Sequence, residues 1–360
     1  MPYVRQIVAE KANIINHNKK IYGSFAEIGA GQEVVNYFFK AGRASGTVAK
    51  SMSAYDMIFS DLIYGKAGRY VCEKRLSQML NHEYSLLENR LKKTRGKNTC
   101  FFAFADTVAV STLKKDHMSS HHGWMGVRFQ SKPLKKYDEI LLHVNLKDRT
   151  RLQQYEVLGV LGVNLIYSAF YEKKTASALV SSLVDNFEKN RIEIDLIKCQ
   201  GPSFSKLHTT QLNLELMKQG LTPIVVLNPT AQSPLDVFYE KPMVLHTSTI
   251  SPIKKPKALS FQLTRQLQPS IKNQIVHNTN YWYELKKALR QYTSKELHFC
   301  LSENEFKKFI SEKTYPDHTL IQVMGKFFDK KTKLYVKKPR SSKKSSFVQW
   351  LEKEGKVQWV

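Results

Sequence analysis

The sequence predicts an α/β protein with a layered parallel or mixed sheet, flanking helices and a smaller C-terminal α+β region. Short apolar strands alternate with amphipathic helices through roughly the first 230 residues, which is typical of α/β layers. A glycine-rich turn joins the first of these strands to a helix, and a Pro- and Lys-containing stretch at 251–256 precedes a second region. The chain of 360 residues is long enough for two domains.

The first predicted strand and helix meet in the segment 24–33, which has the sequence SFAEIGAGQE. A helix is expected from Glu33 to Ala41, because Val34, Val35 and Phe38 form an apolar face and Gly42 follows as a stop. A second strand is predicted at 47–53, ending near Asp56. This order predicts a strand, a tight turn and a helix whose N-terminus faces the turn.

The remaining elements of the α/β region follow from apolar periodicity and from turn residues. A long helix is predicted from Glu73 to Gly96, with Lys74 and Arg75 on its solvent face. Asp148 is expected to cap a later apolar helix. Further strands are predicted at 99–105, 124–129, 140–146, 191–198 and 223–227, and further helices at 176–187 and 209–219.

These patterns suggest an α/β domain at 1–250, a C-terminal α+β region at 257–338 and a basic, aromatic tail at 339–360. The segments that begin at Glu27 and Glu193 resemble each other as β-turn-helix-β units. The α/β domain is therefore either one continuous domain or two similar halves, 1–135 and 136–250. Helices are expected at 282–292 and 306–310 in the C-terminal region.

The amino-acid composition limits the kinds of binding partner and the cellular location expected for this protein. The net charge is +25, and a dense basic stretch from Lys326 to Lys344 contains one acid, Asp329. Such a charge is either a solvated lysine-rich surface or a site for nucleic acid and other polyanions. The N-terminus lacks the pattern of a secretion signal, and the longest apolar run, 157–170, is shorter than a membrane span. These features predict a cytoplasmic protein with four free cysteine thiols.

The glycine-rich turn is the strongest candidate for a ligand site. Glu27, Gly29 and Gly31 match the start of a nucleotide- or adenosyl-binding turn, and Asp56 stands where a ribose-binding acid is expected. The third glycine is absent, because Gln32 follows Gly31. An acid at the helix start disfavours a pyrophosphate and favours an uncharged adenosyl group. The alternative is a tight structural turn without a ligand.

Two residues are candidates for chemistry. Asp106 follows a buried strand, where partial burial tunes a carboxyl group as an acid or base, and His122 stands beside Gly123 as a possible general base. Asp148 and Asp195 also lie near strand ends, although capping competes for such residues. His117 and His121 would complete a metal cluster with His122, but an exposed polar loop is favoured and no metal is predicted.

Stretches across nearly the whole chain carry a family resemblance: FAEIGAGQEV at 25–34, ASGTVAKSMSAYDM at 44–57, SDLIYG at 60–65, RYV at 69–71, FFAFADTVA at 101–109, HHGWMGVRFQ at 121–130, LGVLGVNLIY at 158–167, MGKFFDKKTKLYV at 324–336 and WLEKEGKVQ at 350–358. They resemble a bacterial family of uncharacterised proteins whose members carry two inconsistent names, nicotinate-nucleotide adenylyltransferase and TonB-dependent receptor. The resemblance implies a shared fold, and neither named activity has its expected residues here. Phosphate-loop, nucleophile-elbow, zinc-protease and kinase motifs are absent as well.

The sequence thus predicts an α/β enzyme of transferase type that binds a nucleotide or S-adenosylmethionine, with Asp106 and His122 as chemistry groups. The alternative is a non-catalytic protein that binds nucleic acid or another polyanion through its basic tail. The residues leave open whether the protein is an enzyme at all.

Overall fold

The computed structural model describes residues 7–111, 121–188, 190–227, 231–240, 246–247, 274–277, 282–301, 303–311, 320–336 and 346–359. The chain divides into two compact units, Met1–Leu221 and Thr222–Val360. Each unit has its own apolar core. The first unit holds the predicted glycine-rich turn and is described first.

One mixed sheet of six strands forms the centre of the first unit, in the order β2-β1-β3-β4-β5-β6. β1 pairs in parallel with both β2 and β3, whereas the pairs from β3 to β6 are antiparallel. This confirms the predicted α/β class. The strands are β1 (Ile21–Ile28), β2 (Val48–Ser53), β3 (Cys100–Val108), β4 (His122–Gln130), β5 (Tyr137–Leu146) and β6 (Ile192–Gln200).

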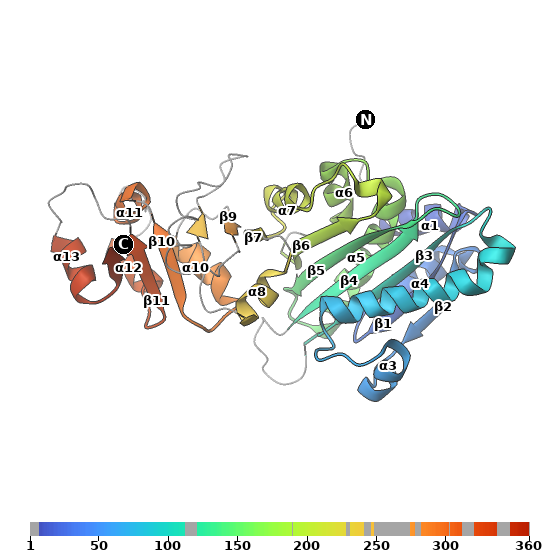
Figure 1. The fold of residues 1–360 in the computed structure, drawn as a ribbon, viewed down its shortest axis with the longest axis horizontal. Helices are drawn as coiled ribbons and strands as arrows, with labels where there is room; N and C mark the ends of the chain where they lie inside the picture. The colour runs from blue at the N-terminus through green and yellow to red at the C-terminus, as the bar shows by residue number, and fades with distance from the viewer. Residues whose placement is uncertain are drawn as a thin grey trace. The chain divides into compact units, whose positions relative to one another are not determined.

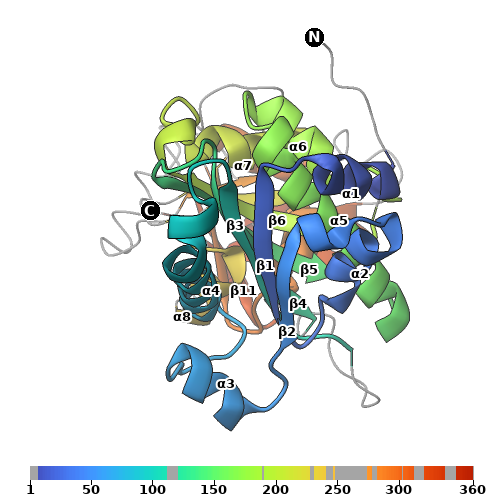
Figure 2. The ribbon, with the colours of Figure 1, turned by 90° about the vertical axis from the view of Figure 1, so that its right-hand side faces the viewer.

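Helices cover both faces of this sheet (Figures 1 and 2). α1 (Val8–His17), α2 (Gln32–Ala41) and α5 (Arg151–Tyr171) lie on one face, and α4 (Glu73–Arg95) lies on the other. Side chains confirm the assignment, since Gly162 of α5 packs on Val34 and Phe104, while Gly126 packs on Leu80 of α4. α6 (Ala176–Leu183) and α7 (Thr209–Lys218) add leucines to the core on the α5 face.

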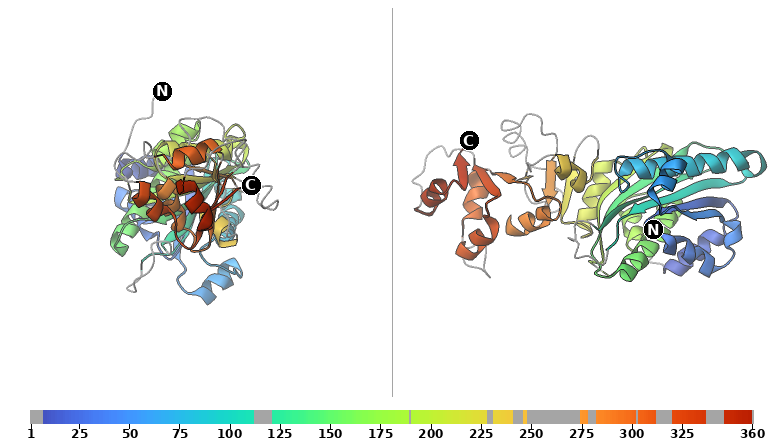
Figure 3. Two further views of the ribbon diagram at one scale, coloured as in Figure 1. Left: turned by 90° about the vertical axis from the view of Figure 1, so that its left-hand side faces the viewer. Right: turned by 90° about the horizontal axis from the view of Figure 1, so that it is seen from below.

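The path of the chain makes the ends of β1 and β3 a topological switch point. The chain leaves β1 through α2 to reach β2, and returns through α3 (Met57–Tyr64) and α4 to β3 on the other side of β1. α2 and α4 therefore leave the same edge of the sheet toward opposite faces, as Figure 3 shows from below. In open α/β sheets this is the place where ligands bind, beyond the carboxyl ends of the strands.

α3 is thinly packed against the rest of the first unit (Figure 2). It buries only Ser60 and Tyr64. Ile58 and Leu62 are 72% and 79% exposed, an unusual state for large apolar side chains. An element with so few buried contacts opens at low cost in free energy compared with the core.

The second unit contains two small sheets and short helices. Its core includes Phe299, Phe309 and Phe327, and Trp359 packs edge-on against Phe306. The elements are β7 (Ile224–Leu227), β8 (His246–Thr247), β9 (Gln274–His277), β10 (Leu297–Leu301), β11 (Thr332–Val336), β12 (Val357–Trp359), α8 (Pro234–Glu240), α10 (Trp282–Arg290), α11 (Glu303–Phe309), α12 (Leu320–Phe327) and α13 (Ser346–Lys353).

Two local predictions are wrong. The cap of α5 is Thr150, whose hydroxyl accepts from the Gln153 amide at 3.3 Å, whereas Asp148 instead pairs with Arg191 at 2.9 Å. Arg75 of α4 is fully buried rather than solvent-facing, because it pairs with Asp61 of α3.

No described helix is long and apolar enough to cross a membrane.

A buried ion pair ties α1 to the connection after α6. The Lys11 ammonium lies 2.7 Å from an Asp185 carboxylate oxygen and donates to Asn164 Oδ1 at 2.9 Å, with both charged side chains nearly inaccessible. Asn164 in turn donates to the carbonyl of Asp185 at 2.8 Å. The low dielectric of the interior makes such a pair costly to break.

We expect Lys11→Met to lower the free energy of unfolding of the first unit by about 3 to 5 kcal/mol, because Asp185 would remain buried without its counter-charge. Adding Asp185→Asn should recover part of this loss. Urea unfolding, followed by circular dichroism, measures both effects. The exposed Lys19→Met is the matched control, and an equal loss in that variant would contradict the buried-pair explanation.

Candidate functional site

Two buried carboxyl groups lie side by side at the carboxyl ends of β1 and β3. Glu27 and Asp106 are register partners in the parallel pair, so their side chains leave the same face of the sheet. This is the face covered by α2 and α5. Glu27 Oε2 accepts from the Ser53 hydroxyl at 2.6 Å. Its other oxygen and both oxygens of Asp106 have no partner in good hydrogen-bond geometry within the described structure, although the Ser51 hydroxyl lies near Glu27 and the Ile28 amide lies near Asp106.

Burial raises the pKa of both acids. The pKa of Asp106 lies well above its usual value, because the carboxyl is desolvated and faces the charge of Glu27, and the nearby Ile28 amide only partly offsets this. Burial also raises the pKa of Glu27, opposed by the hydroxyls of Ser53 and Ser51. Asp106 is therefore the member of the pair that retains its proton more readily. A protonated carboxyl donates a hydrogen bond, which a carboxylate does not.

The glycine turn lies directly on this pair. A Cβ on Gly31 would overlap the carboxyl of Asp106, and one on Gly29 would overlap the carbonyl of Val108. Gly29 also has a φ of +94°, a conformation that residues with a side chain rarely adopt. The two glycines are thus required by close approach to β3. The turn is partly accessible, since Ile28, Gly29 and Gln32 are only half-buried.

Two tyrosines fix the outer side of the turn. The hydroxyls of Tyr55 and Tyr155 both lie within hydrogen-bond distance of the carbonyl of Gly29, and they lie 2.8 Å from each other. Each hydroxyl has one proton, so two of these three contacts are hydrogen bonds at any one time. Tyr55 follows β2 and is exposed, whereas Tyr155 comes from α5. Burial and the bond to Tyr55 raise the pKa of Tyr155 to about 12, so it remains a donor. These contacts hold the turn from both flanking elements.

Asp56 occupies a helix cap at the start of α3. Its carboxylate accepts from the amide of Phe59 at 2.8 Å, which satisfies one of the free N–H groups of the first turn. The residue is exposed and lies just beyond the end of β2. Its candidate role on a ribose remains a prediction, and capping is the contact that the structure gives it.

His122 belongs to a chain of side chains that crosses β4, β5 and β6. His122 Nδ1 lies 3.2 Å from His143 Nε2, and His143 Nδ1 lies 2.6 Å from Asp195 Oδ1. Asn145 donates to the other oxygen of Asp195 at 2.7 Å. His143 and Asp195 are fully buried, whereas His122 is half-buried. A carboxylate behind an imidazole fixes its orientation and tautomer, as in general-base arrays.

A break in the strand register positions Asp195. His143 pairs with Leu196 and Val144 pairs with Ile194, so Asp195 is the extra residue of a β-bulge in β6. A bulge leaves its extra residue outside the ladder and redirects its side chain. Here the redirected carboxylate reaches the ring of His143. Trp124, also fully buried, lies against that ring at 5.0 Å and its Nε1 has no described partner.

The two predicted chemistry residues lie on opposite faces of the sheet. Asp106 pairs with Met125 in β4, so His122, three residues from Met125, has the other orientation. It shares its face with Trp124, and therefore with α4. The structure brings Asp106 together with Glu27, Gly29 and Gly31, and places His122 separately at the same edge.

The predicted histidine loop is only partly covered by the structure. His117 lies outside the described residues. In the part of the chain that is described, no group of three or more His, Cys, Asp or Glu side chains is placed to hold a metal ion. His121 is half-buried, and its Nε2 has no described partner.

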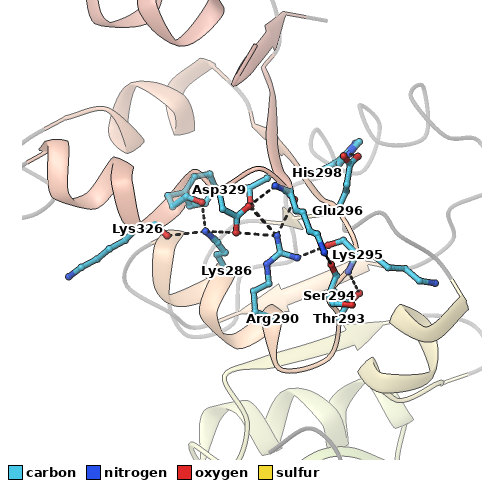
Figure 4. A network of polar contacts seen from close by, with 12 residues as sticks. Lys286, Arg290, Thr293, Ser294, Lys295, Glu296, His298, Lys326 and Asp329 are labelled. Atoms are coloured by element: carbon cyan, nitrogen blue, oxygen red, sulfur yellow. Dashed lines mark hydrogen bonds and ion pairs between the residues drawn. The ribbon is translucent and has the colours of Figure 1, made fainter. Parts of the chain in front are cut away.

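Some of the basic residues in the C-terminal unit have structural roles (Figure 4). Lys286 lies 3.0 Å from Asp329 and donates to the carbonyl of Phe327 at 2.6 Å. Arg290 also contacts Asp329 and donates to the carbonyl of Lys331. Partial burial raises the pKa of Asp329, but hydrogen bonds from the Thr332 hydroxyl, Lys286 and the Lys331 amide outweigh it and hold this pKa below its usual range. Most of the tail cations, from Lys337 to Lys344, lie outside the described residues.

Comparison with known proteins gives a limited likeness. No protein-family model and no curated protein matches the chain. A competence/damage inducible protein CihA from Agrobacterium tumefaciens matches 47% of this chain and 99% of its own length, at 14% identity and a TM-score of 0.35. CinA superfamily proteins from Enterobacter cloacae and Escherichia coli match similar shares at 10% and 11% identity, with TM-scores of 0.35 and 0.32.

Sequence reasoning missed several residues of these clusters. His143 and Asn145 alternate within an otherwise apolar strand, and polar residues two apart share a face, which was a usable signal. Tyr155 lies in a helix pattern where an aromatic residue indicates core packing. Arg75 gave no signal, because a basic residue in the first turn of a helix is normally solvated.

The raised pKa of Asp106 predicts a specific pH dependence. Because the folded state holds this proton more tightly than the unfolded state, the stability of the native protein falls as pH rises above the ordinary carboxyl pKa of about 4. Asp106→Asn removes this loss. The variant should gain stability relative to the native protein with rising pH, at up to roughly 1.4 kcal/mol per pH unit within that window. Thermal unfolding between pH 4 and pH 8 measures the difference.

Glu88→Gln, a half-exposed carboxyl on α4, is the control for this experiment. Its unfolding temperature should follow that of the native protein across the range. A constant difference between Asp106→Asn and the native protein at all pH values would contradict the raised pKa.

Proposed function

We propose that this protein binds a nucleotide or adenosyl ligand beyond the carboxyl ends of β1 and β3 and acts as an α/β enzyme of transferase type. The observation that carries the proposal is the buried pair of Glu27 and Asp106 under the turn, with three carboxyl oxygens that have no described partner. Buried polar atoms are nearly always hydrogen-bonded, so such a group calls for a partner.

The chemistry of the pair selects the ligand. Glu27 accepts hydrogen bonds, and protonated Asp106 can donate one. A ribose or an amino group provides the matching donors and acceptors. No Lys or Arg forms an ion pair with Glu27 or Asp106 in the described structure. Glu33 adds an acid to the first turn of α2, where Lys40 lies 3.6 Å from it. These features favour an adenosyl group over a pyrophosphate, because phosphate charge would meet carboxylates.

The chemical roles follow from position. Asp106 lies under the turn and is the residue suited to protonate or hydrogen-bond a ligand atom there. His122 lies at the same edge on the α4 face, with its ring held by His143 and Asp195. We assign it the role of a base for a second substrate that reaches the edge of the sheet.

Titration calorimetry of the native protein with S-adenosylmethionine, NAD and ATP tests the proposal. We expect S-adenosylmethionine to bind most tightly, and Glu27→Gln to weaken it about tenfold through loss of a charged acceptor. Glu88→Gln is the matched control and should bind as the native protein does. Asp56→Asn, which retains a capping side chain, reports whether Asp56 contacts the ribose. A folded sample that binds none of the three ligands would remove this proposal.

A second candidate is a protein that binds nucleic acid or another polyanion, and it is favoured by the net charge of +25. α13 and β12 pack through Val348, Leu351 and Val357, so deleting the tail would disturb the C-terminal core. A variant that removes the charge of the tail without deleting it is therefore a better test than a truncation. In this variant Gln replaces five basic residues: Lys337, Lys338, Arg340, Lys343 and Lys344.

If these residues contact phosphates, the slope of log affinity against log salt for single-stranded RNA should fall by roughly 0.7 for each lost contact. Fluorescence anisotropy at several salt concentrations measures the slope. The control replaces the exposed Lys19, Lys66, Lys92, Lys97 and Lys132 with Gln. Equal slopes for the native protein and the tail variant would exclude the tail as the binding surface.

A further inference from the structure

Arg75 is a fully buried guanidinium with unused hydrogen-bond capacity. Its Nη2 pairs with Asp61 of α3, whereas Nε and Nη1 have no described partner. The guanidinium lies 5.3 Å from the centre of the Tyr70 ring. An arginine keeps its charge at any ordinary pH, so it cannot escape this environment by losing a proton. The hydrogen-bond donors Nε and Nη1 are satisfied only when a further acceptor reaches them.

The surroundings of Arg75 favour an anion. Arg75 lies in the first turn of α4, which has 23 residues and a positive partial charge at this end. The N-cap is Cys72, whose sulfur accepts from the Arg75 amide at 3.4 Å, a weak cap compared with Ser or Asp. Asp61 is the acid that pairs with Arg75, and it also accepts from the Tyr70 hydroxyl at 3.0 Å.

α3 and α4 each carry a further buried polar atom without a described partner. Gln78 is one turn after Arg75 on the same face of α4, and its Oε1 is buried without a partner. Ser60, one of the two buried residues of α3, has an unpartnered hydroxyl. Glu83 of α4 is already paired with Lys50 of β2 at 2.7 Å. Asp61 balances the charge of Arg75, so what Arg75 still lacks is an acceptor for Nε and Nη1.

We propose that Arg75 binds a small oxyanion, the phosphate or carboxylate group of a small molecule, between α3 and the N-terminal turn of α4. The anion accepts from Nε or Nη1 of Arg75 and from the Ser60 hydroxyl. Entry requires a small displacement of α3, which buries only two residues. This site lies on the α4 face of the sheet, opposite the face of Glu27 and Asp106, and does not depend on the proposed nucleotide ligand.

Inorganic phosphate and acetate, titrated into the full chain at constant ionic strength, test the proposal by thermal unfolding. We expect phosphate at tenfold its dissociation constant to raise the unfolding temperature by about 3 °C. Arg75→Gln should abolish this rise. The exposed Arg90→Gln, on the same helix, is the matched control and should retain it. Acetate in place of phosphate distinguishes a carboxylate site from a phosphate site.

Asp61→Asn provides an independent variant if Arg75→Gln does not fold. Removing the competing carboxylate should strengthen phosphate binding several-fold, a change opposite in sign to general destabilisation. Asp106→Asn should leave the phosphate response unchanged, which separates this site from the turn. An unaltered response in Arg75→Gln, or no response of the native protein to either anion, would overturn the proposal.

Discussion

The close approach of the β1–α2 turn to the carboxyl of Asp106 is the constraint on which the candidate site depends. Gly31 has no side chain because Asp106 occupies that space, and Gly29 lies against the carbonyl of Val108. The same packing removes water from Asp106, and the resulting desolvation is the main cause of its raised pKa. One steric fact therefore determines the shape of the turn, the start of α2 and the protonation of the acid beneath it.

Buried charged side chains have more hydrogen-bond and ion-pair partners in the core than at the edge of the sheet. The Lys11 ammonium, deep between α1, α5 and α6, has a carboxylate and several oxygens around it. Glu27, Arg75 and Asp106 each retain atoms without a described hydrogen-bond or ion-pair partner. All three lie where β1 and β3 end or where α4 begins. This contrast between a fully paired core charge and incompletely paired charges at the edge is the basis of both proposed ligand sites.

The sequence predicted the strand-turn-helix unit and most elements of the first sheet, because apolar periodicity and glycines are local signals. It selected Glu27, Gly29, Gly31 and Asp106 as separate candidates, and the pairing of β1 with β3 is what brings Asp106 beside Glu27; their function stays a prediction. It could not predict the burial of Arg75, which depends on Asp61 arriving from α3. The contact between His143 and Asp195 was equally hidden, because the bulge that turns Asp195 toward His143 depends on the register of β5 and β6.

The separation of Asp106 from His122 follows from strand geometry rather than from distance along the chain. Alternation places neighbouring residues of β4 on opposite faces, so a shift of one residue in the β3–β4 register would exchange Met125 and Trp124. In the observed register the acid pair belongs with α2 and the histidine array with α4. A ligand that engages both must cross the end of the sheet at the switch point, where the chain leaves a turn on one face and a long helix on the other.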